Sequence, residues 1–179
     1  ARPRRPRPPR RPGGTWSFGG APVTGGTGPW AGWSLVVVLE DPALPASRVA
    51  VFDGLRVIGV GESTEVELPA VAGGTGIVGS VVWDGDAGST GDRVLVDGVP
   101  LVRAVSGADD DVFASWADGA VPFCAPVDAV ECAAEANQLG FDTGVFEPTP
   151  IAGDRIRVEV TGGTEAVVLG VLSLVMRGT

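Results

Sequence analysis

Residues 30–55 decide the fold and read WAGWSLVVVLEDPALPASRVAVFDGL. Two short apolar runs within them, at 33–39 and 49–52, are typical of strands that are covered on both faces. Residues 41–47 lie between these runs and predict a turn, because their two prolines fix φ and donate no ladder hydrogen bond. A strand–turn–strand unit of this kind predicts the inner wall of a β-sandwich or jelly roll.

The rest of the chain repeats this pattern. At 179 residues, with 44% apolar residues, it is long enough to bury a core, and its 28 Gly and 15 Pro suit many tight turns. Outside the opening stretch, strands are predicted at 15–18, 55–60, 64–68, 77–83, 155–160 and 166–176, with a hairpin at 93–102 around Asp97-Gly98. One short helix is predicted at 128–139, between the N-cap Asp128 and Gly140. The predicted fold is all-β, an antiparallel β-sandwich or jelly roll with one short helix.

Charge divides the chain into an arm and a body. Residues 1–12 hold six of the 13 basic residues, all of them Arg, and only Ala and Pro besides, which predicts a disordered arm. That arm either binds a polyanion, links to a preceding segment, or reflects a mis-assigned start. Residues 13–179 form one predicted domain, in which seven Arg stand against 22 Asp and Glu. So acidic a body repels nucleic acid and anionic membranes, and no apolar stretch reaches the ~20 residues of a membrane helix.

The absence of histidine restricts the chemistry. Without His the chain lacks the usual near-neutral acid or base, so Ser-His-Asp and Cys-His catalytic arrangements are excluded. Two converging carboxylates could still serve a glycosidase, but no pair among the acids is singled out. The sequence therefore predicts no enzyme and no catalytic residues.

Three carboxylates share the Gly-rich loop at 83–92, WDGDAGSTGD: Asp84, Asp86 and Asp92. Their spacing can gather oxygen ligands around Ca²⁺, although Asp and Gly are also the residues that a tight turn favours. We predict no other cofactor. A second acidic run, at 109–111, is interpreted as a solvated loop.

Tryptophan is a second candidate ligand-binding feature. Trp30 and Trp116 lie beside Gly, Pro and Asp and are candidates for stacking on a glycan. Trp33 and Trp83 adjoin Val-rich runs and are predicted to be core residues.

Four segments in order resemble a segment of large secreted, often actinobacterial, surface proteins. They are GPWAGWSLVVVLEDPALPASRVAVFDG at 28–54, WDGDAGSTGD at 83–92, ANQLGFD at 136–142 and TGGTEAVVLGVLSLVM at 161–176. The family carries variants of AGWSLVVVYEDP, VFDG, EGDxGxTGD and NQLGFD. The resemblance implies an extracellular or cell-surface, structural or adhesive module whose partners are other surface-protein subunits or cell-wall glycans. The alternative is a Ca²⁺-assisted carbohydrate-binding module.

Cys124 and Cys132 are the only two cysteines. They form a disulfide in an exported protein and are two buried thiols in a cytoplasmic one. The surface-protein resemblance implies the disulfide, which would contribute roughly 2–3 kcal/mol through its short loop.

Overall fold

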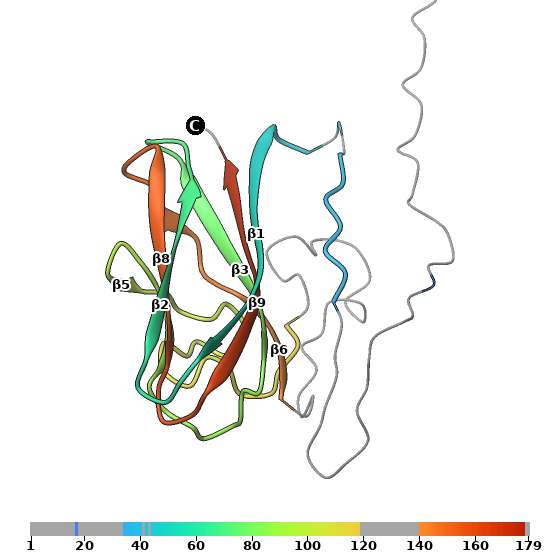
Figure 1. Cartoon of the computed structure of the whole chain (residues 1–179). Helices are drawn as coiled ribbons and strands as arrows, with labels where there is room; N and C mark the ends of the chain where they lie inside the picture. Colours follow the sequence, from blue (N-terminus) through green and yellow to red (C-terminus); the bar gives the residue numbers. More distant parts are fainter. Residues whose placement is uncertain (1–16, 18–33, 41, 43, 119–139, 178–179) are drawn as a thin grey trace, which may run out of the picture. The chain divides into compact units, whose positions relative to one another are not determined.

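The computed structural model describes residues 17, 34–40, 42, 44–118 and 140–177. Its contacts divide the chain into two units, Ala1–Pro45 and Ala46–Thr179. Within the second unit the described strands form two antiparallel sheets, as Figure 1 shows. The first has the order β1-β9-β3-β6 with β7 beside β3, and the second has the order β2-β8-β4-β5. The strands are β1 (Ser47–Ile58), β2 (Ser63–Pro69), β3 (Thr75–Trp83), β4 (Asp92–Val96), β5 (Val99–Pro100), β6 (Phe141–Val145), β7 (Thr149–Pro150), β8 (Arg155–Gly162) and β9 (Val167–Arg177).

Strand β9 is the centre of the first sheet. Its sequence, VVLGVLSLVMR, is apolar at almost every position, as expected for a strand covered on both faces. It pairs with β1 on one side and β3 on the other, so the strand predicted at 166–176 is confirmed and lies inside the sheet. Its buried leucines and Met176 pack in one core with Val78 of β3, Val158 of β8 and Phe146, which follows β6.

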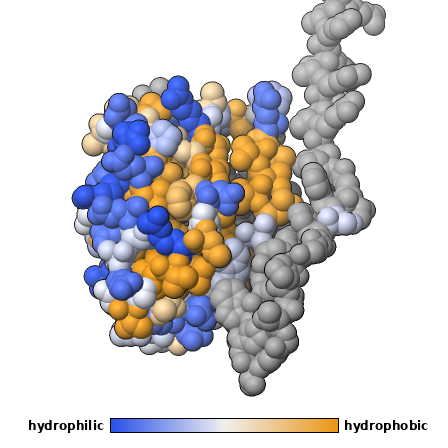
Figure 2. Space-filling model, viewed as in Figure 1, coloured by the Kyte–Doolittle hydropathy of each residue, from blue (hydrophilic) through white to orange (hydrophobic). Residues whose placement is uncertain are grey.

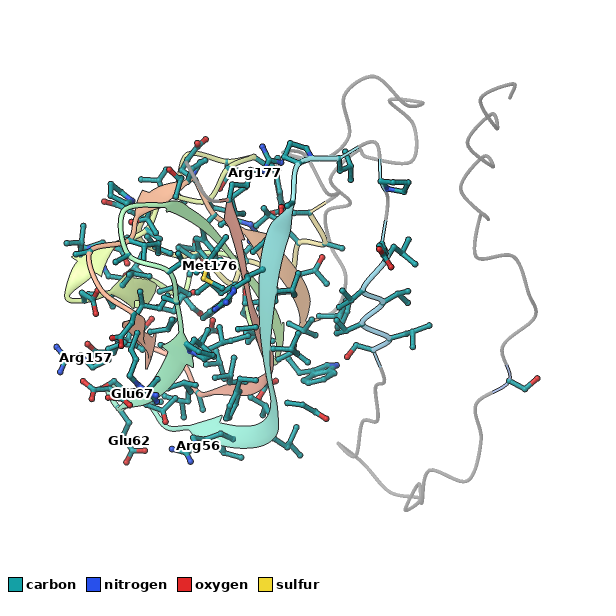
Figure 3. All side chains as sticks on the ribbon, turned by 90° about the horizontal axis from the view of Figure 1, so that it is seen from above. Arg56, Glu62, Glu67, Arg157, Met176 and Arg177 are labelled. Carbon is teal, nitrogen blue, oxygen red and sulfur yellow. The ribbon has the colours of Figure 1, made fainter. Side chains whose placement is uncertain are left out.

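The second sheet has one apolar and one polar face. Thr64, Val66 and Leu68 of β2 point into the core, while the alternate positions are exposed. On the exposed face, Arg155 pairs with Glu67 at 2.9 Å between Nη2 and Oε2. Figure 3 shows Glu67 and Arg157 extending outward while Met176 lies inside the molecule. Hydrophilic residues accordingly gather over β2 and β8 in Figure 2.

The predicted all-β antiparallel sandwich is confirmed. The runs at 49–52 and 55–60 are one strand, β1, whose register shifts between Asp53 and Arg56. The hairpin is confirmed at Asp97-Gly98, where φ is 49° and 82°. Strands β6 and β7 were not predicted, because FDTGV and TP carry too few apolar residues to show a strand pattern.

The strand predicted at 33–39 is wrong in its described part, since residues 34–40 form no strand. A strand requires a partner ladder, and the described residues of Ala1–Pro45 offer none. The predicted arm at 1–12 and the predicted helix at 128–139 lie outside the described residues. Among those that are described, no helix has the length and apolarity needed to cross a membrane.

Candidate functional site

A buried arginine organises the loop at 101–118, the described residues that follow β5. Arg103, 1% exposed, donates from Nε to Asp118 Oδ2 at 2.8 Å. Its Nη1 donates to the Val112 carbonyl at 2.6 Å, and its Nη2 donates to the Trp116 carbonyl at 2.7 Å. Asp142 of β6 completes the network, with Oδ1 3.5 Å from Nη1. Because the guanidinium satisfies carbonyls and carboxylates together, it fixes this loop against β6.

Asp142 anchors the same loop from the sheet. It is fully buried and accepts the backbone N–H groups of Trp116 at 2.8 Å and Ser115 at 3.2 Å. Burial raises its pKa to about 6, although these hydrogen bonds and the Arg103 charge oppose the shift. Near neutral pH, the free-energy cost of burying this carboxylate is therefore larger than the stabilisation from its hydrogen bonds and from the Arg103 charge.

Five carboxylates from three loops meet beside this network and form what we term the acidic loop cluster: Asp86, Asp92, Asp110, Asp111 and Glu165. The loops are held by side-chain to backbone hydrogen bonds. Gly88 donates its N–H to Asp111 Oδ2 at 2.9 Å, and Gly91 donates to Asp110 Oδ1. Asp86 donates its N–H to Glu165 Oε2 at 3.0 Å, across the β8–β9 turn. The two acidic runs that the sequence showed separately thus form one cluster.

Asp92 is the buried member of the acidic loop cluster. It is 0% exposed, and its Oδ2 accepts the N–H of Phe113 at 2.6 Å. Its Oδ1 is buried with no hydrogen-bond partner among the described residues, as is Oδ1 of Asp111. Burial raises the pKa of Asp92 to about 6, and the charges of Asp111 and Asp110 add to the rise. Burial likewise raises the pKa of Glu165 to about 7.

The three calcium ligands that the sequence predicted differ in their exposure to solvent. Asp84 and Asp86 are exposed, whereas Asp92 is buried. Asp84 has a φ of 70° and donates its N–H to the Gly140 carbonyl, which is a turn role. Across 44–118 and 140–177, no three His, Cys, Asp or Glu side chains are grouped so that they could hold a metal ion. The calcium prediction therefore needs a direct test.

Of the other predicted site residues, the structure describes only Trp116. Trp30, Cys124 and Cys132 lie outside the described residues. Trp116 is half-buried, with its backbone fixed by Arg103 and Asp142, so its use in stacking stays a prediction.

Trp83, predicted as core, is also half-buried. Its ring lies 6.1 Å from that of Phe141 on the neighbouring strand. A Cβ at Gly170 would come within 2.0 Å of the Trp83 ring, so this β9 position has to stay glycine.

Sequence reasoning missed the apolar edge of the first sheet, which we term the β1 edge: Val49, Val51, Leu55 and Val57. Leu55 is 78% exposed and Val57 is 70% exposed. Strand β1 pairs with β9 on one side, and no described strand pairs with its other side. Figure 2 shows hydrophobic residues on the face along β1. Long apolar edges are usually shielded in proteins that act alone, so the β1 edge is a candidate interaction surface.

The buried carboxylates predict that stability falls as pH rises from about 4 to 7. In that window the folded state holds more protons than the unfolded chain, because folding raises the pKa values of Asp92, Asp142 and Glu165. Asp110, whose pKa is lowered chiefly by the Gly91 N–H, acts oppositely at lower pH. The melting temperature is expected to be several degrees higher at about pH 5 than at about pH 8.

The variant Asp92→Asn isolates the contribution of the Asp92 carboxylate to the pH dependence of stability. The amide keeps an acceptor for Phe113 but cannot ionise, so the pH dependence of melting should shrink. Asp154→Asn, at an exposed position, is the matched control and should leave the pH dependence of melting unchanged. A melting temperature that rises from pH 5 to pH 8 in the unmodified protein would contradict the assignment.

Comparison with models of known protein families found no match, and comparison with curated proteins found none either. Among solved structures, two crystal structures of BuGH86 in complex with neoagarooctaose, one wild-type and one a variant, are similar to this chain. Each is 12% identical over 73% of this chain, with a TM-score of 0.43. The chain spans 18% of the length of each of those chains. At this level the likeness gives no indication of activity or ligand.

Proposed function

We propose that the chain is a non-catalytic structural or adhesive module on the outside of a bacterial cell. The β1 edge carries the proposal, because an apolar strand at the edge of a sheet is suited to adding a partner's strand. Its other supports are the acidic body and the ordered resemblance to secreted surface proteins. Its partners are other surface-protein subunits or cell-wall components.

Deletion of the gene in the source bacterium tests this proposal. Attachment or surface structure should be lost and should return with an unmodified copy. A copy carrying Val51→Lys and Leu55→Lys on the β1 edge should fail to restore it, whereas Val99→Lys, 61% exposed on β5, should restore it. Normal attachment and surface structures in the deletion strain would argue against the proposal.

A Ca²⁺-assisted carbohydrate-binding module is the second candidate. The unpaired buried oxygens of Asp92 and Asp111 favour it, since such oxygens bind hard cations. With Ca²⁺ the melting temperature should rise, and a glycan array should give Ca²⁺-dependent binding that Trp116→Ala removes. A blank array with and without Ca²⁺ would dismiss this candidate.

A further inference from the structure

The chain itself contains an apolar segment that matches the β1 edge. Residues 34–39, SLVVVL, carry no charge and form no strand. Their apolar side chains are well exposed, from 44% at Val36 to 61% at Leu39. β-Branched residues in a short run favour extended backbone, and such a run becomes stable only when it pairs with another strand. This segment therefore has the composition of a strand but no strand to pair with among the described residues of its unit.

The β1 edge offers the pairing that the segment lacks. Strand β1 is 12 residues long, so it can accept all of residues 34–40. In an antiparallel alignment that sets Val37 opposite Val51, Leu39 lies opposite Val49. The same alignment sets Glu40 opposite Arg48, two oppositely charged exposed residues. Cross-strand apolar pairs and pairs of opposite charge both stabilise antiparallel strands, so this register is favoured at several positions together.

The connection between segment and strand favours a partner copy. It reads DPALPA at 41–46, and its sequence favours extended backbone at Leu44, the residue before Pro45. It contains no glycine for the positive φ of the tightest hairpin turns. Pro-rich connections behave as semi-rigid spacers, a property that suits pairing with a neighbouring copy. Exchange of an identical element between copies is a low-cost route to assembly.

We propose that residues 34–39 of one copy add as an antiparallel strand to the β1 edge of a second copy. Each copy then offers one donor segment and one acceptor edge, and repetition of the contact builds either a closed dimer or a longer assembly. This inference rests on the proposed function and names its partner as another copy of this chain.

Light scattering on the full chain, across the micromolar to submillimolar range, tests the strand addition. The mass should rise with concentration above the 18.1 kDa of one chain. Val37→Lys in the donor and Val51→Lys in the acceptor should each return it to 18.1 kDa, while Val99→Lys on β5 should not. Circular dichroism of each variant confirms that the sandwich is still folded.

A peptide of residues 34–40 supplies an independent measurement. Added in excess, it should occupy the β1 edge and lower the mass of the assembly, whereas a peptide with Val37→Lys should not. A mass of 18.1 kDa at every concentration, or an assembly indifferent to both variants and to the peptide, overturns the strand addition. Either result leaves attachment of single copies to other surface components, which the gene deletion tests separately.

Discussion

Replacing Arg103 by Met is expected to lower the free energy of unfolding by about 3–5 kcal/mol, the usual effect of breaking a buried charge network. Methionine fills similar space but leaves Asp118 and Asp142 buried without their cation. It also leaves the carbonyls of Val112 and Trp116 without a donor. Urea unfolding at neutral pH measures the loss.

Arg155→Met is the matched control for Arg103→Met. Arg155 also pairs with a carboxylate, Glu67, but its side chain is 58% exposed, so its loss should cost less than about 1 kcal/mol. Equal effects from the two arginines would show that the buried network does not organise the loop at 101–118.

The second large effect is expected at Gly163, in the turn between β8 and β9. Its φ is 41°, and a Cβ there would come within 2.3 Å of the Asp92 nitrogen and 2.6 Å of the Thr90 carbonyl oxygen. Since both neighbours are backbone atoms, Gly163→Ala must push apart the loops that carry the acidic loop cluster. A loss of about 3 kcal/mol is expected from left-handed strain and overpacking together, again measured by urea unfolding.

Gly98→Ala separates strain from crowding. Gly98 has a φ of 82° but no atom within 4 Å of the Cβ position, so only the conformational term, about 1 kcal/mol, applies. A Gly163→Ala protein as stable as the Gly98→Ala protein would mean that the turn relaxes without disturbing Asp92.

Much of the fold could be predicted because its strands carry their own patterns. β2 alternates as STEVELP, β9 is apolar at almost every position, and the dipeptide Asp97-Gly98 marks its hairpin. Where a strand depends on a partner, pattern alone fails. The run at 33–39 has a strand composition without a ladder in its own unit, and β6 has a ladder with little strand composition.

The candidate site was less predictable, because it depends on loops that only the folded sheets bring together. Asp110 meets Gly91 through the positions of β4 and the loop after β5, and Glu165 joins from the β8–β9 turn. Arg103 carried no signal, since a buried arginine is unusual and RAVSG resembles an ordinary surface loop. The β1 edge could have been suspected from Val49, Val51 and Val57 at alternating positions, but edge placement follows from topology.

Labelling of intact bacterial cells with an antibody raised against the sandwich tests the central claim most directly. A surface module should be labelled on unbroken cells and removed by external protease, while a cytoplasmic marker protein stays untouched. Labelling confined to lysed cells, with the protein resistant to external protease, would contradict the account.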